Sequence, residues 1–271
     1  MNLTDQKYIM ELFADSWADK YQKEHRRTPK EAPSLLGNAQ KGMEYFLHNG
    51  FARAGGEQAG YGDIAIEALN NCVKSIGSYT SFIIKKDSHE MLWSEFEALC
   101  KKQGKGANKR VNEGVIKGFI ELAKVSSKCD YNPFGYLANK IQGSMTDAFL
   151  TLRNIKGIGD KISSFLLRDM VCILDIEAKV PFEHRVFLQP IDRWIKENAI
   201  CLWKDLGERT PNWVIALRIT DKCNEFGVSG VRFNQGAWQY GVTEVIDVNK
   251  LRIKLNDICM YINKFKLTKN I

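Results

Sequence analysis

LRNIKGIGDKISSFLLRDM, residues 152–170, is the stretch of this chain that decides the fold. It begins with an apolar helix end at Leu152 and Ile155, and it turns at Gly157-Ile158-Gly159. A second helical pattern follows, whose buried face is expected to hold Ile162, Phe165, Leu166 and Met170. The sequence therefore predicts two amphipathic helices joined by a tight turn.

This turn has the chemistry of an anion site. Gly157 and Gly159 can adopt positive φ and let a phosphate approach the bare backbone. The amides of Gly157, Gly159 and Lys161 are expected to hold that phosphate, because N–H groups at the start of a helix point outward. Such a contact grips DNA without reading its sequence. The alternative is an ordinary helix-turn-helix corner, which leaves Gly159 and an exposed Lys161 unexplained.

The rest of the chain repeats the helical spacing, and strand-like alternation is nearly absent. We expect an all-α fold in which residues 1–271 form a single unit with internal lobes. The most loop-like stretch is Arg26–Pro33, which has two prolines and little to bury. Beyond an N-terminal helix, helices are expected at about 36–49, 61–77, 90–102, 111–127, 145–154, 160–174, 191–200, 211–226, 232–245 and 247–264.

Composition is that of an ordinary globular protein, with 44% hydrophobic and 26% charged residues. The net charge of +7 suits a polyanionic partner. Basic residues crowd into Lys101–Arg110, KKQGKGANKR, where two glycines suggest an exposed, flexible loop able to follow a phosphate backbone. A solvated turn between two helices is the alternative for this stretch.

Cysteine spacing argues against a metal or disulfide framework. The seven cysteines lie at least 22 residues apart, as between Cys201 and Cys223, so none forms a CxxC pair. We interpret them as reduced thiols of the core. The sequence also lacks a long apolar run and the pattern of a signal peptide. The expected location is the cytoplasm, with association to the nucleoid in a prokaryote, and no membrane contact.

The hairpin residues resemble those of the HhH-GPD superfamily of DNA glycosylases, and the archaeal-type 8-oxoguanine glycosylases are most similar. In lysine-bearing members the nucleophile follows the second hairpin glycine by two positions, which is where Lys161 stands. The resemblance implies two packed helical lobes, a helix-hairpin-helix at about 145–174, and an active site in the cleft between the lobes. A later segment, Arg232–Trp238, resembles a C-terminal helix of the superfamily.

The superfamily also needs an aspartate at the start of a later helix, commonly after a proline turn. Asp192 follows Pro190-Ile191, and Glu183 follows Val180-Pro181-Phe182. We favour Asp192, because it has the right residue type, lies in a position suited to a helix cap, and stands 31 residues beyond Lys161 as in the archaeal-type enzymes. Glu183 remains the alternative.

The resemblance implies a base-excision repair enzyme, a DNA glycosylase with AP lyase activity that removes 8-oxoguanine from double-stranded DNA. Lys161 would attack the sugar of a flipped nucleotide as a neutral amine, and Asp192 would assist. A non-catalytic helix-hairpin-helix DNA-binding protein and a monofunctional glycosylase for alkylated or other modified bases are the alternatives. We expect a monomer.

A flipped base needs aromatic faces and amide hydrogen bonds. Candidates for its pocket are Phe165, Trp238, Trp93 and Gln40, for each of which plain core packing is the alternative. We expect no required cofactor and no iron-sulfur cluster, since the cysteine set of endonuclease III relatives is absent. The resemblance implies a monovalent cation on the main-chain carbonyls of Arg153, Ile155 and Ile158.

Overall fold

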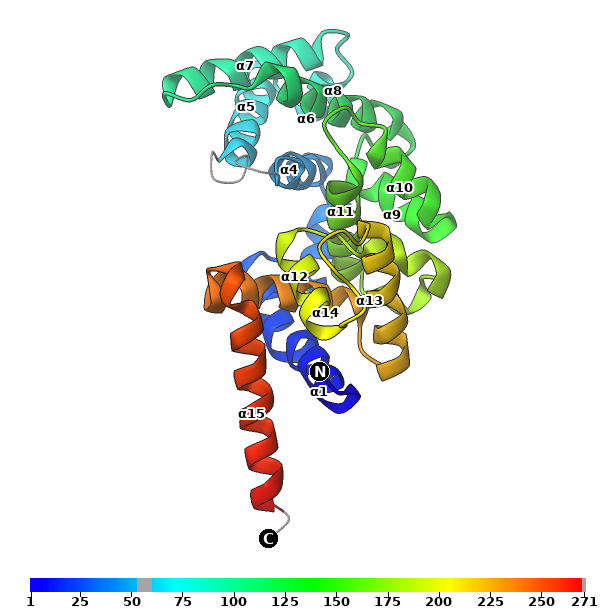
Figure 1. The fold of residues 1–271 in the computed structure, drawn as a ribbon. Helices are drawn as coiled ribbons and strands as arrows, with labels where there is room; N and C mark the ends of the chain where they lie inside the picture. The colour runs from blue at the N-terminus through cyan, green and yellow to red at the C-terminus, as the bar shows by residue number, and fades with distance from the viewer. Residues whose placement is uncertain (53–59, 270–271) are drawn as a thin grey trace. The chain divides into compact units, whose positions relative to one another are not determined.

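The computed structural model describes residues 1–52 and 60–269, and for residues 261–269 the backbone alone. All regular structure in these ranges is helical, and no strand occurs in them (Figure 1). The prediction of an all-α fold is confirmed.

The chain divides into two compact units. One is continuous, Lys30–Met170, and is called the central unit below. The other, the terminal unit, combines Met1–Pro29 with Val171–Ile271, so that it is made from both ends of the sequence.

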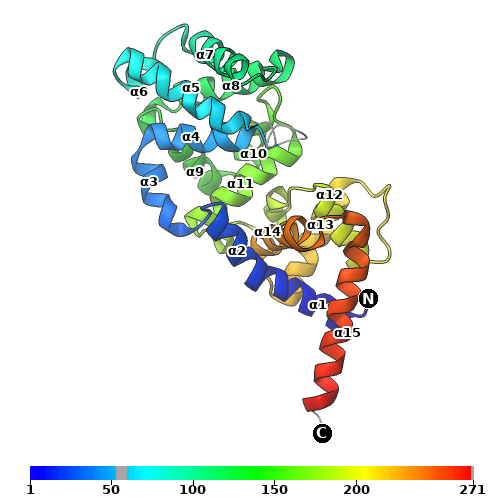
Figure 2. The same ribbon diagram turned by 90° about the vertical axis from the view of Figure 1, so that its left-hand side faces the viewer.

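The central unit consists of helices packed through phenylalanines. Phe46, Phe96 and Phe119 are completely buried, and so are Phe82 and Phe134. Its helices (Figure 2) are α3 (Ala32–Gly37), α4 (Ala39–Gly50), α5 (Tyr61–Ile76), α6 (Tyr79–Ile83), α7 (Ser88–Lys102), α8 (Lys109–Val125), α9 (Pro133–Gly143), α10 (Met145–Arg153) and the start of α11 (Asp160–Leu174).

Side-chain caps fix where several of these helices begin. The Asn132 Oδ1 accepts the N–H groups of Phe134 and Gly135, and its Nδ2 donates to the carbonyls of Leu35 and Leu36. One side chain thus caps α9 and ties it to α3. Ser144 caps α10 by accepting the N–H of Asp147.

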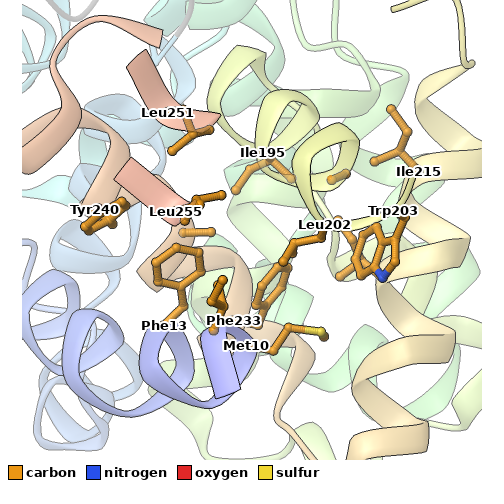
Figure 3. Close-up of a cluster of buried hydrophobic side chains, with 14 of the residues drawn as sticks. Met10, Phe13, Ile195, Leu202, Trp203, Ile215, Phe233, Tyr240, Leu251 and Leu255 are labelled. Atoms are coloured by element: carbon orange, nitrogen blue, oxygen red, sulfur yellow. The ribbon is translucent and has the colours of Figure 1, made fainter. Parts of the chain in front are cut away.

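The terminal unit surrounds α14 (Gly230–Tyr240). Its other helices are α1 (Leu3–Leu12), a π-helical turn η1 (Phe13–Trp17), α2 (Ala18–Glu24), α12 (Arg193–Leu202), α13 (Asn212–Phe226) and α15 (Leu251–Lys269), with short turns η4 (Glu177–Lys179), η5 (Phe182–Leu188), η6 (Gly241–Val245) and η7 (Val248–Lys250). Figure 3 shows their shared core, in which Phe13, Phe233 and Leu202 meet.

Close approach at Gly236 sets the position of α14. A Cβ on Gly236 would lie 1.9 Å from the carbonyl oxygen of Phe13, so no side chain fits there. Arg232 of the same helix donates to the carbonyls of Ala14 and Asp15 and to the Asp19 carboxylate. The helix is therefore fixed to the N-terminal segment by backbone contact and by hydrogen bonds.

Most expected helices agree with the structure within two or three residues, whereas α6 and α9 were not predicted. The loop expected at Arg26–Pro33 ends early, because a 3₁₀ turn covers Pro29–Glu31 and α3 begins at Ala32. Pro33 is compatible with that helix, since a first turn does not use the N–H that proline lacks.

The loop expected at Lys101–Arg110 is shorter than predicted, because α7 extends to Lys102 and α8 begins at Lys109. Its backbone is held at two points: Tyr61 donates to the carbonyl of Gly106 over 2.6 Å, and Asn112 donates to that of Ala107 over 2.9 Å.

The seven cysteines are free thiols, and Cys72, Cys100, Cys223 and Cys259 are buried. Burial, with a smaller effect of the Glu95 carboxylate, raises the pKa of Cys72 to about 11. This thiol therefore stays protonated at neutral pH, as expected of a core residue.

Candidate active site and nucleic-acid interface

The helices α10 and α11 of the central unit are joined by residues 154–159, called the 154–159 turn below. Two backbone hydrogen bonds between residues three apart stabilise this turn. The N–H of Ile155 donates to the carbonyl of Leu152, and the N–H of Ile158 donates to the carbonyl of Ile155. Leu152, Ile155 and Ile158 are all buried. The apolar side chains thus point inward and leave the glycine backbone on the outside.

The turn rests on two glycines of α8 that lie four residues apart on one helix face. A Cβ on Gly118 would lie 2.2 Å from Cγ2 of Ile155, and one on Gly114 would lie 2.9 Å from Cγ of Lys156. Without side chains at these positions, the turn approaches the helix backbone directly. The sequence around α8 therefore explains where the turn sits.

Gly157 and Gly159 play different parts. Gly157 has a φ of 92°, and a Cβ there would lie 2.8 Å from Cγ2 of Val115, so the fold requires glycine. Gly159 is outside the positive-φ region, and a Cβ there would meet nothing within 4 Å. The expectation that both glycines could use positive φ is met at Gly157 alone. The fold would therefore accommodate a side chain at Gly159, and the backbone there is open to a ligand.

This difference gives a prediction for paired variants. Gly159 is the N-cap of α11, since its carbonyl accepts the N–H of Ser163. Threonine caps about as well as glycine, so Gly159→Thr is expected to change the free energy of unfolding by less than about 0.5 kcal/mol. Its added bulk should nevertheless weaken duplex DNA binding by about tenfold or more.

Gly157→Ala is the matched control for this measurement. It should destabilise the chain by roughly 1–2 kcal/mol, because alanine is strained at that φ. Thermal unfolding and fluorescence anisotropy with a labelled duplex measure the two effects. Duplex binding by Gly159→Thr equal to that of the unmodified chain would contradict a phosphate at Gly159.

Lys161 lies in the first turn of α11 and is half-buried. Phe165 lies one helical turn later on the same face and is also half-buried. The guanidinium carbon of Arg168 lies 5.1 Å from the centre of the Phe165 ring, and Arg168 pairs with the Asp169 carboxylate at 2.8 Å. Arg168, which the sequence reasoning did not single out, therefore contributes to the position of Phe165.

The other two pocket candidates of the central unit have different surroundings. Gln40 on α4 donates its side-chain amide to Asn70 over 2.7 Å and to Glu44 over 3.3 Å. Trp93 on α7 is 5% exposed and packs against Phe96. Trp93 thus offers almost no surface to a base and serves as a core residue, the alternative considered from sequence.

Asp192 belongs to the terminal unit and is the N-cap of α12. Its Oδ1 accepts the N–H of Ile195 over 2.9 Å, so the capping role inferred from sequence is confirmed. Glu183 lies on η5 and is exposed. The two acids therefore differ in local structure: Asp192 is held at a helix start, whereas Glu183 is on a short 3₁₀ turn.

A buried amide pair holds the turn before Asp192, and the sequence reasoning missed it. The Nδ2 of Asn234, on α14, donates to Oε1 of Gln189 over 3.1 Å and to the carbonyl of Pro190 over 3.4 Å. Both side chains are almost fully buried. The signal was the pair Asn234-Gln235 between the apolar residues Phe233 and Ala237 of α14, since buried amides need partners.

Trp238 lies on the same helix, half-buried. Its ring packs edge-on against Tyr21 at 5.7 Å and against His25 at 5.6 Å between ring centres. In the structure Trp238 therefore contacts α2 and the residue that follows it. The segment expected to be helical around it is confirmed as α14.

The structure distributes the candidates over both units. Gly157, Gly159, Lys161 and Phe165 come together in the central unit, while Asp192, Glu183 and Trp238 belong to the terminal unit. Of the carbonyls expected to hold a monovalent cation, that of Ile155 already accepts the N–H of Ile158, which leaves it one lone pair for an ion. No cluster of three or more His, Cys, Asp or Glu side chains suited to a metal occurs among the described residues.

Comparisons with protein-family models, with curated proteins and with solved structures found no match to this chain. Within the described residues, no helix combines the length and apolar character needed to cross a bilayer.

Proposed function

We propose that this protein is a base-excision DNA glycosylase with AP lyase activity, acting through a helix-hairpin-helix formed by α10, the 154–159 turn and α11. One observation carries the proposal: the start of α11 combines Gly159, an N-cap at which a Cβ would meet nothing within 4 Å, with a half-buried lysine two positions later. A bare helix N-terminus suits a phosphate, and an amine beside it suits attack on the adjoining sugar.

The chemistry follows from the amine. Nζ of Lys161 attacks C1′ of the flipped nucleotide, and the bond from C1′ to the base breaks with its electron pair leaving on the base. One proton of Nζ passes to the departing base, and opening of the C1′–O4′ bond, with the second proton moving to O4′, gives an imine. The imine acidifies C2′, so transfer of a C2′ proton to solvent expels the 3′ phosphate by β-elimination and nicks the strand. The carboxylate of Asp192 would stabilise the positive charge that develops on the sugar.

Phe165 is the aromatic residue best suited to stack on the flipped base, because it follows Lys161 by one turn. The proposed lesion is 8-oxoguanine in duplex DNA.

Borohydride trapping tests the proposal. With a duplex containing one abasic site or one 8-oxoguanine, we expect a covalent protein–DNA adduct in the presence of borohydride, because borohydride reduces the imine. Without borohydride we expect cleavage on the 3′ side, because the imine persists long enough to eliminate the 3′ phosphate. A duplex-binding module would bind without an adduct. A monofunctional glycosylase would leave alkali-labile abasic sites but form no adduct. Duplex binding without an adduct, or alkali-labile sites without an adduct, would overturn the lyase assignment. A panel of duplexes, each with a different lesion, identifies the base.

A further inference from the structure

A set of cations lies beside the 154–159 turn, in the same unit. The aliphatic part of the Lys156 side chain lies across α8 at Gly114. A Cβ added to Gly114 would lie 3.0 Å from both Cβ and Cδ of Lys156. Arg110 precedes Gly114 by four residues and Lys117 follows it by three, which places both on that face of the helix. All three side chains are exposed. We call Arg110, Lys117 and Lys156 the basic strip.

The carboxylates near the strip form ion pairs with basic residues outside it. Glu113 pairs with Lys109 at 3.9 Å, Glu121 with Lys124 at 3.4 Å and Asp160 with Arg153 at 2.6 Å. Among the residues that the structure describes, no carboxylate lies within ion-pair distance of the three strip residues. The three strip residues thus present positive charge next to the exposed backbone of the turn, with Glu113 and Glu121 each one helical turn from Lys117 on α8.

The strip has the dimensions of a nucleic-acid backbone contact. Arg110 and Lys117 are seven residues apart, or about 10 Å along the helix axis. A DNA strand advances about 3.4 Å per phosphate along its axis, so this length corresponds to about three phosphates. The hydrogen bonds to Gly106 and Ala107 hold the chain that leads into α8, so the cations are presented from a fixed helix.

We propose that the basic strip binds the phosphate backbone of duplex DNA next to the phosphate held by the 154–159 turn. This inference rests on the proposed function for its substrate, and it adds a second contact, made by Arg110 and Lys117 of α8 together with Lys156 of the turn. Lys117 and Lys156 lie outside the basic stretch visible in the sequence. Lys117 shares a face of α8 with Arg110, and packing of the turn on α8 brings Lys156 to that face.

The test compares two triple variants that lose the same charge. In Arg110→Gln/Lys117→Gln/Lys156→Gln, the slope of log affinity against log salt, between about 50 and 200 mM, should fall by about 2 to 3, since each lost phosphate contact removes about 0.9. The control, Lys74→Gln/Lys86→Gln/Lys128→Gln, changes exposed lysines elsewhere in the unit. Its slope should change by less than about 0.5. An equal change in both variants, or none in the strip variant, would overturn the proposal.

Two further measurements separate this proposal from the enzymatic one. At low salt and saturating protein, the control variant should form the borohydride adduct as the unmodified chain does, because none of its three lysines belongs to the hairpin or to the strip. If the unmodified chain forms no adduct but the salt slope of the strip variant falls as expected, the phosphate contact of the strip is supported and the lyase assignment fails. Competition with single-stranded RNA and with anionic vesicles should leave duplex DNA at least about tenfold preferred, and preference for either competitor would overturn the duplex as the partner.

Discussion

Lys161→Gln is expected to abolish both the borohydride adduct and strand nicking. The change removes the amine that forms the imine, so the lyase rate should fall by at least about 10³-fold, equivalent to about 4 kcal/mol of transition-state stabilisation. Duplex affinity should stay within a few-fold, because the backbone amides of the turn supply most of the local phosphate contact. Single-turnover cleavage and anisotropy binding measure the two quantities.

Lys161→Arg provides the matched control for charge. Arginine keeps the positive charge and half-buried bulk, but its guanidinium stays protonated and forms no imine. We therefore expect normal binding together with the same loss of adduct. Full nicking by either variant would mean that another amine, or none, performs the reaction.

Asp192→Asn should lower the single-turnover rate of base removal by about 10²- to 10³-fold, the range seen when a preorganised electrostatic partner is lost. Asparagine caps a helix about as well as aspartate, so the hydrogen bond to Ile195 can persist and the free energy of unfolding should change by less than about 1 kcal/mol. A large loss of rate without a loss of stability would thus show that the rate depends on the negative charge of Asp192 and not on its role as helix N-cap.

Glu183→Gln decides between the two acids. Glu183 is exposed on a 3₁₀ turn, and its substitution should leave cleavage within about threefold of the unmodified chain. A crippled Glu183→Gln beside an active Asp192→Asn would reverse the assignment. Thermal unfolding of both variants shows whether any loss of rate comes from loss of fold.

The local pattern of the sequence was enough for most helices, because apolar spacing and caps are local signals. α11 begins after Gly159, whose carbonyl accepts the N–H of Ser163, and α12 begins after the N-cap Asp192. The short α6, of five residues, gives too little periodicity to detect. α9 was missed although Asn132-Pro133 is a good helix start, and its N-cap also bonds to residues almost 100 positions earlier in the chain.

The candidate site was predictable only in part, because the contacts that define it join residues far apart in the sequence. Gly157 and Gly159 look alike in sequence. The positive φ of Gly157 and its packing against Val111 and Val115 distinguish it from Gly159, where a side chain would fit. The contact from Asn234 to the Pro190 carbonyl joins residues 44 positions apart, which no local pattern encodes. Likewise, the burial of Trp93 depends on neighbours in space.

The division of the chain bears on the order in which the protein is made. The central unit is one continuous stretch, Lys30–Met170, so all of its contacts become available once that stretch has left the ribosome. The terminal unit differs, because Arg232 and Gly236 of α14 complete contacts with Phe13–Asp19, more than 200 residues earlier. During synthesis the first helices therefore have no α14 to pack against until nearly the whole chain has emerged. The half that carries Lys161 can be folded well before the half that carries Asp192.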